Sequence, residues 1–167
     1  MNMIRNLTFT KLVILATAGS IFVLGGAFIF QALGYAPCKL CLWQRWPHAA
    51  AIVFGGAALA SQKRILAWLG AASAATTSAT GVYHSGVERA LWEGPTTCSG
   101  SSNIGSMSAD DLLNSIMTAP LVRCDEIPWR VSDMIPLEIL DITMANLNAL
   151  GSAVFAILWI MAVRKAD

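Results

Sequence analysis

The sequence predicts an all-α membrane protein: a bundle of four antiparallel transmembrane helices, with a long polar loop between the third and the fourth. The first observation is composition, because 56% of the 167 residues are hydrophobic and only 13% are charged, whereas soluble domains have about 25% charged residues. The second is a set of four apolar stretches, at about 12–33, 42–61, 65–84 and 142–163. Each approaches the ~20 residues that cross a bilayer core. We therefore expect a single membrane domain over residues 1–167.

The first apolar stretch begins after Lys11. It is longer than the apolar core of a secretory signal, which has roughly 7–15 residues, so we expect it to remain as a transmembrane helix. The second stretch is harder to delimit, since residues 49–60 alone are too short to span. Proline is tolerated best in the first helical turn. Pro47 therefore predicts a helix that begins within residues 42–46, directly after Cys41.

The third stretch is rich in small residues, above all at 71–80. Small residues let helices approach closely in lipid, so we expect this helix inside the bundle. In the polar loop that follows, residues 85–141, the Gly/Ser-rich part at 96–106 predicts flexibility. Ser108 as a cap and Pro120 as a stop predict a short amphipathic helix between them. That helix either lies at the membrane surface or packs on the loop itself.

The distribution of charge predicts the orientation. Positive residues mark the cytoplasmic side of a membrane protein. They gather near both termini and at the connection between the second and third stretches: Arg5, Lys11, Lys63, Arg64, Arg164 and Lys165. Acidic residues gather in the loop 85–141, and Lys39 and Arg45 are exceptions to the pattern. We expect a protein of the bacterial inner membrane with cytoplasmic termini, and with the loops 34–41 and 85–141 in the oxidising periplasm. No basic patch predicts nucleic-acid binding.

Two of the four cysteines, Cys38 and Cys41, form a Cys-x-x-Cys motif between the first two apolar stretches. Such a pair can close and reopen a small disulfide ring, or bind a metal. Arg45 lies one helical turn after Cys41. Its charge, together with the helix N-terminus, favours the thiolate, which is the reactive form of cysteine. The motif therefore predicts a redox-active pair at the membrane surface.

The other two cysteines, Cys98 and Cys124, lie well apart in the long loop. Structural zinc sites usually combine two closely spaced cysteine pairs, so this spacing is a weak signal for zinc, and we expect no metal. A purely structural disulfide is a serious alternative for Cys98 and Cys124. It is a poor one for Cys38 and Cys41, because so short a ring cross-links almost no chain.

The motif Cys38-x-Leu40-Cys41-x-x-Gln44-Arg45, placed before the second of four spans, resembles the disulfide bond formation protein B (DsbB) family. So does Cys98 followed by the segment Cys-Asp-Glu-Ile-Pro-Trp-Arg at 124–130. The resemblance covers nearly the whole chain. The chain departs from the family at 131–138, which is longer than the usual link, and at Asp141, where glycine is common.

The resemblance implies an enzyme, a quinone-dependent protein-disulfide oxidoreductase that reoxidises a periplasmic DsbA-like thiol oxidase. It implies that the partner attacks Cys98, that Cys124 is the mate of Cys98 and exchanges with Cys38, and that Cys41 faces the quinone, either ubiquinone or menaquinone. The residues that it implies for quinone contact are Arg45, Gln44, His84 and Met144.

Two other functions remain open at this stage. The vitamin K epoxide reductase-like family is also a small helical bundle with Cys-x-x-Cys, but its motif follows the cysteine-bearing loop, whereas here the motif precedes the second span. A non-enzymatic metal-binding or assembly protein is the alternative from another class. Some residues have plainer interpretations too: Arg45 could reach lipid headgroups, Gln44 could cap the helix, and His48 and His84 could be wet residues at the interface.

Overall fold

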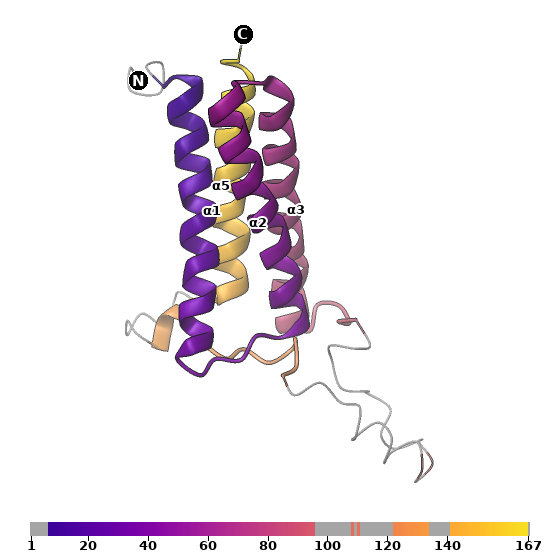
Figure 1. Ribbon diagram of the computed structural model, residues 1–167. Helices are drawn as coiled ribbons and strands as arrows, with labels where there is room; N and C mark the ends of the chain where they lie inside the picture. Colours follow the sequence, from indigo (N-terminus) through magenta and orange to yellow (C-terminus); the bar gives the residue numbers. More distant parts are fainter. Residues whose placement is uncertain (1–6, 96–107, 109, 111–121, 134–140, 167) are drawn as a thin grey trace.

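The computed structural model describes residues 7–95, 108, 110, 122–133 and 141–166. These residues form four long helices and a short 3-10 helix, η3: α1 (Phe9–Ala32), α2 (Lys39–Ser61), α3 (Arg64–Glu88), η3 (Val131–Asp133) and α5 (Met144–Val163). The expected helical bundle is confirmed (Figure 1). Cys98, and nearly all of the amphipathic helix expected after Ser108, lie outside the described residues.

The four helices form a ring in which each packs against two neighbours, in the order α1, α2, α3, α5 and back to α1. Neighbours run antiparallel, and the start of α1 lies at the same end as the end of α5 (Figure 1). The turn between α2 and α3 lies at that end too. The opposite end, called here the cysteine end, carries the 33–38 connection and the segments that lead out of α3 and into α5 (Figure 1).

α2 begins earlier than expected from Pro47. Its first residue is Lys39, and the N-cap is Cys38, whose Sγ accepts a hydrogen bond from the backbone N–H of Cys41 at 3.2 Å. A side-chain acceptor at the N-cap satisfies one of the free N–H groups of the first turn. Pro47 then lies inside the helix. The prediction of a start at 42–46 is wrong, because the sulfur cap sets the start and the helix accommodates the proline.

The tightest packing joins α3 to α5. A Cβ added at Gly81 would lie 3.0 Å from the Cα of Ala149, and one at Gly70 would lie 2.6 Å from the ring of Trp159. Glycine at position 81 therefore lets the backbone of α5 approach α3 closely, and glycine at position 70 makes room for the indole of Trp159. Trp159 is fully buried and anchors an apolar core with Leu12 and residues of α3. This is the close packing of small residues expected for helices in lipid.

Three of the helices, α1, α3 and α5, are long and apolar enough to cross a membrane. The outward faces of these helices carry large apolar side chains, as a lipid-facing surface requires. α2 has 23 residues but is less apolar, because its N-terminal half contains Gln44, Arg45 and His48. The chain is thus a multi-pass membrane protein whose second helix carries its polar groups near the cysteine end.

The described parts of the polar loop pack onto the cysteine end. Val131 N donates to Ile142 O at 2.9 Å, in a short antiparallel bridge between Arg130 and Thr143 just before α5. Trp129 lies edge-on to Phe30 of α1, with ring centroids 5.6 Å apart. The segment 122–133 is therefore tied both to α5 and to the end of α1.

Candidate functional site

The site begins with the two thiols at the start of α2. The Sγ atoms of Cys38 and Cys41 lie 2.8 Å apart, and both cysteines are free. Cys38 is 4% exposed, whereas Cys41 is half-buried. The hydrogen bond that the two sulfurs share, together with burial, raises the pKa of the Cys38 thiol. Cys38 therefore keeps the shared proton, and Cys41 is the sulfur with more thiolate character.

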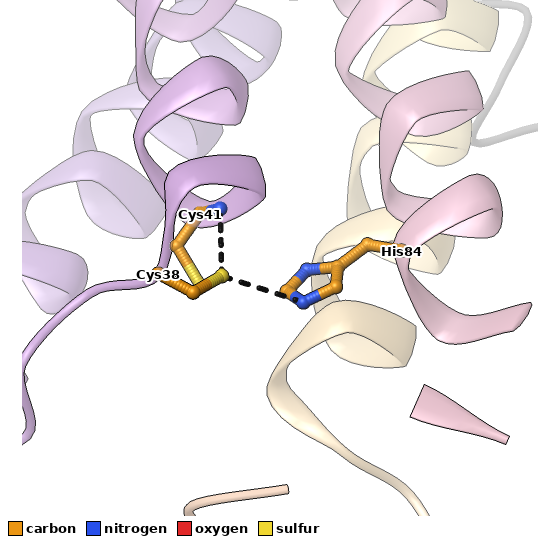
Figure 2. A group of neighbouring side chains, drawn as sticks. All are labelled: Cys38, Cys41 and His84. Atoms are coloured by element: carbon orange, nitrogen blue, oxygen red, sulfur yellow. Dashed lines mark hydrogen bonds between the residues drawn. The ribbon is translucent and has the colours of Figure 1, made fainter. Parts of the chain in front are cut away.

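His84 reaches the same pair from α3. Its Nε2 lies 3.5 Å from Cys38 Sγ. The dashed line between the ring and the sulfur in Figure 2 marks this interaction. The same nitrogen is 3.9 Å from a carboxylate oxygen of Glu88, one turn further along α3. Glu88 in turn accepts a hydrogen bond from the Thr143 hydroxyl at 2.6 Å. Two helices and the cap of a third thus enclose the cysteine pair.

Cys124 brings the long loop into contact with this site. It is fully buried and shares an apolar cluster with Cys38, Leu40 and Val87. Its backbone is hydrogen-bonded to the His84 ring. Cys124 is disulfide-bonded, whereas Cys38 and Cys41 are free. The structure therefore brings three of the four candidate catalytic cysteines together, and Cys98 lies outside the described residues.

Arg45 lies one turn after Cys41 but extends toward α1. Its guanidinium donates to Gln31 Oε1 at 2.6 Å and to the Ala27 carbonyl at 3.3 Å, and it lies 4.8 Å from the centre of the Phe28 ring. Its Nε is buried and has no hydrogen-bond partner among the described residues. A buried donor of this kind is costly to leave unsatisfied, so it is a natural position for a ligand's oxygen.

The other two candidate contact residues lie in different surroundings. Gln44 is 6% exposed and faces the bundle interior, where it donates to His84 Nδ1 at 3.0 Å. Met144 is the first residue of α5 and is half-buried. Gln44 thus lies behind His84 as seen from the cysteines.

Sequence reasoning missed four polar residues near the site: Gln31, His48, Glu88 and Asn148. The interpretation of His48 as a wet interfacial residue is wrong, because its side chain is only 2% exposed and lies 2.8 Å from Asn148 Oδ1. A signal existed in the i, i+4 spacing of Gln44 and His48, which places both on one face of α2. The register between α2 and α5, which selects Asn148 as the partner, is not visible in the sequence.

The ligand atoms of Cys38, Cys41 and His84 all lie within 4.8 Å of one another. Thiolates and imidazole are ligands that zinc prefers, so this group could hold a thiophilic metal ion as well as perform thiol chemistry. The geometry favours exchange, because a third cysteine, Cys124, belongs to the same buried cluster as Cys38.

The model of the disulfide bond formation protein DsbB family matches residues 9–162. The chain belongs to the DsbB family. The match covers all four helices and the loop with Cys98 and Cys124. Membership carries a role in disulfide-bond formation and suggests thiol oxidoreductase activity. No curated protein and no solved structure matches the chain.

Proposed function

We propose that the protein reoxidises a periplasmic DsbA-like thiol oxidase and passes the electrons through two cysteine pairs to membrane quinone. The observation that carries the proposal is that Cys124 and Cys38 belong to one buried cluster, beside His84. Thiol–disulfide exchange requires the sulfurs to meet, and this shared cluster supports a link between the loop and the membrane-embedded pair.

The exchange steps balance as follows. A thiolate of the partner attacks the Cys98–Cys124 disulfide at Cys98, and Cys124 leaves as a thiolate. Cys124 then attacks Cys38 of the oxidised Cys38–Cys41 pair, and Cys41 leaves. The partner's second thiolate attacks the partner sulfur that is joined to Cys98, which closes the partner's disulfide and releases Cys98 as a thiolate. Cys98 then attacks Cys124 of the Cys38–Cys124 bond, which re-forms the Cys98–Cys124 disulfide and releases Cys38 as a thiolate. Overall, the partner loses two S–H bonds and gains one S–S bond, while the Cys38–Cys41 disulfide becomes two thiols.

The residues around Arg45 fit a quinone. When bound, a quinone accepts the two electrons and two protons that the thiols release, and becomes a quinol. Arg45 would offer its buried Nε–H to a quinone oxygen, and Phe28 would supply an apolar face nearby. Gln44, His84 and Met144 are the other proposed contacts, from α2, α3 and α5. The quinone is ubiquinone or menaquinone.

The proposed orientation places the cysteine end in the periplasm and both termini in the cytoplasm of the bacterial inner membrane. The positive residues of the short connection, Lys63 and Arg64, support it, because they lie at the end opposite the cysteines. The oxidising periplasm is also where a soluble thiol oxidase works.

Trapping the exchange intermediates tests the order of the steps. Cys124→Ala should accumulate a covalent adduct between Cys98 and the thiol oxidase, because the resolving thiol is gone. Cys98→Ala should abolish this adduct, and Cys41→Ala should instead favour a Cys38–Cys124 bond. Non-reducing gels with mass mapping identify the joined sulfurs. If the partner were found on Cys38 in the Cys124→Ala variant, the loop pair would be structural and the relay wrong.

A second measurement separates the oxidase from the metal-binding alternative that Cys38, Cys41 and His84 suggest. The purified protein should oxidise a reduced DsbA-like protein when a short-chain ubiquinone or menaquinone is added, and should contain no stoichiometric zinc. Stoichiometric zinc together with no quinone reduction would support the metal-binding function instead.

A further inference from the structure

Behind the cysteine pair, the bundle interior contains a group of polar side chains from three helices. They are Gln44 and His48 of α2, Thr77 of α3, and Asn148 and Ser152 of α5. Four of them, all but Asn148, are at most 6% exposed. Polar groups inside a membrane bundle are costly unless they are hydrogen-bonded, so their arrangement needs an explanation.

A continuous series of hydrogen bonds, called here the amide chain, connects the deepest of these residues to Cys38. His48 Nε2 lies 2.8 Å from Asn148 Oδ1. Asn148 Nδ2 donates to Gln44 Oε1, and Gln44 Nε2 lies 3.0 Å from His84 Nδ1. His84 Nε2 then faces Cys38 Sγ at 3.5 Å. The final step, from the ring to the sulfur, is drawn in Figure 2.

Two backbone carbonyls fix the direction of the amide chain. Gln44 Nε2 also donates to the Leu40 carbonyl at 3.1 Å, and Asn148 Nδ2 also donates to the Thr77 carbonyl at 3.3 Å. A carbonyl oxygen can only accept a hydrogen bond, so the nitrogen of each amide has to face it. Neither amide can therefore turn over without losing a bond to the backbone in an apolar interior.

The fixed amides determine which ring nitrogens carry hydrogen. The Gln44 amide nitrogen can only donate, so His84 Nδ1 has to accept and stays bare. The neutral ring of His84 therefore carries its hydrogen on Nε2, the nitrogen that faces Cys38 Sγ and Glu88. The backbone of Cys124 is also hydrogen-bonded to this ring. At the other end, Asn148 Oδ1 accepts from His48 Nε2, and the buried Nδ1 of His48 has no partner among the described residues. Every donor in the chain points toward the cysteines.

We propose that His48 and Asn148 are positioning residues for the cysteine pair, acting through Gln44 to hold His84 as a fixed Nε2–H donor to Cys38 Sγ. An N–H group aimed at a sulfur stabilises its thiolate. Cys38 becomes a thiolate when exchange releases it, and the donor is then already in place. The fixed tautomer also keeps His84 from accepting a proton at Nδ1. Its importance for turnover rests on the proposed function, whereas the order of the hydrogen bonds does not.

A merely structural role would be a polar cross-link that holds α2 to α5. Such a cross-link would stabilise the bundle but would leave the His84 tautomer free. The two roles are therefore separated by the protonation of the ring nitrogens, which NMR of 15N-labelled histidine measures without quinone or partner. The chain has two histidines, so a His84→Gln variant assigns both sets of signals.

In the unsubstituted protein at pH 8, we expect both rings to be neutral and protonated on Nε2. The His84 Nδ1 signal should show an accepted hydrogen bond, and the His48 Nδ1 signal should not. Gln44→Glu places a carboxylate against His84 Nδ1, so the hydrogen should move to Nδ1. A matched control is Asn146→Asp, the same amide-to-acid change in α5, because Asn146 bonds Ser85 and Thr143 rather than the amide chain. It should leave the His84 signals unchanged.

A second pair of variants tests the deeper part of the chain. Asn148→Leu removes the donor that holds Gln44 Oε1 and leaves the amide held by the Leu40 carbonyl, so the His84 signals should shift toward a mixture with a minor share of the Nδ1–H tautomer. Ser152→Ala is the control, because its hydroxyl touches the same His48 and Asn148 but lies outside the amide chain. A hydrogen on His84 Nδ1 in the unsubstituted protein, or unchanged His84 signals in both Gln44→Glu and Asn148→Leu, would overturn the proposal. If the unsubstituted protein gave the expected NMR pattern but did not reduce quinone, the result would count against the proposed function and not against the amide chain.

Discussion

Cys38 lies deeper than Cys41 at the start of α2, and its thiol has the raised pKa of the pair. We expect iodoacetamide to modify Cys41 at least about tenfold faster than Cys38 in the reduced protein at pH 8, since each pKa unit changes the thiolate fraction about tenfold. Peptide mass mapping over time gives both rates. A Cys98→Ala/Cys124→Ala background leaves only these two thiols. Equal rates would mean that Cys38 does not hold the proton.

Arg45 supports the proposed quinone site through its charge and its buried Nε. Arg45→Met should raise the apparent KM for a short-chain quinone roughly 10–100-fold, because a hydrogen bond from a charged donor contributes about 1.5–3 kcal/mol. Arg45→Lys should rescue only partly, since lysine lacks the planar fork that holds Gln31 and the Ala27 carbonyl together.

The assay of Arg45→Met needs a control for packing, because the guanidinium also lies beside Phe28. Gln31→Leu removes the hydrogen-bond partner while keeping the charge, and should change the KM less than Arg45→Met. If the KM for quinone stayed unchanged in Arg45→Met, Arg45 would have no role in quinone binding and would serve only as a structural or lipid contact.

At the residue scale, the sequence predicted the reactive residues of the site but not the polar residues that lie around them. Cys38, Cys41 and His84 were predicted site residues, and the structure brings their ligand atoms together. Glu88 and Asn148 were missed as neighbours of the site, because a sequence does not show which side chains an acid or an amide meets. Their contacts arise from the register between helices, which depends on side-chain packing across the bundle.

The first residue of helix α2 was not predicted correctly by the sequence rules for helix starts. The preference of proline for the first turn predicted a later start, but Cys38 caps the helix and Pro47 lies well inside. The consequence is functional, because this earlier start places both cysteines at the helix N-terminus, where the free N–H groups favour a thiolate. The small-residue pattern of α3, by contrast, correctly predicted close packing, since composition alone limits how near two helices can come.

The close approach of α3 and α5 at Gly81 can be tested directly. Gly81→Val should destabilise the protein by about 1–3 kcal/mol, because the new side chain meets the backbone of Ala149 and overpacks the interface. Gly56→Val in α2 is the matched control, since nothing lies within 4 Å of an added Cβ there. Thermal unfolding in detergent, followed by circular dichroism, compares the two. If both variants lost the same stability, helix propensity rather than packing would be the cause.

At the scale of the whole molecule, the ring of four antiparallel helices follows from four apolar stretches joined by two short connections and one long one. That much was predictable, because an apolar stretch of about 20 residues has few options in a bilayer. The burial of Cys124 in the same cluster as Cys38 was not predictable from spacing. It requires the segment 122–133 to cross the cysteine end and attach to Phe30 of α1 and to the residues before α5.

The cysteine end also differs from the opposite end in its charge pairing. Arg89 and Arg130 pair with Asp141, and Arg123 pairs with Asp125. The Arg123 guanidinium lowers the pKa of Asp125 below its usual value. The contribution of this pair is therefore present above the unfolded pKa of about 3.9 and is lost as the pH falls through the lower folded pKa. The pairs neutralise the arginines of this end across the neutral pH range.

Lys63 and Arg64 at the opposite end take part in no ion pair among the residues that the structure describes. The bias of Lys and Arg toward short connections on one side sets the orientation of a membrane protein, with that side in the cytoplasm. We therefore expect a single cysteine at position 63 to resist a membrane-impermeant maleimide in intact cells, and one at position 126 to react. Both would be introduced into a protein without its four native cysteines, and permeabilised cells would control for reactivity. Labelling at 63 but not at 126 would invert the topology and place the redox site in the reducing cytoplasm, where the proposed oxidase could not meet its partner.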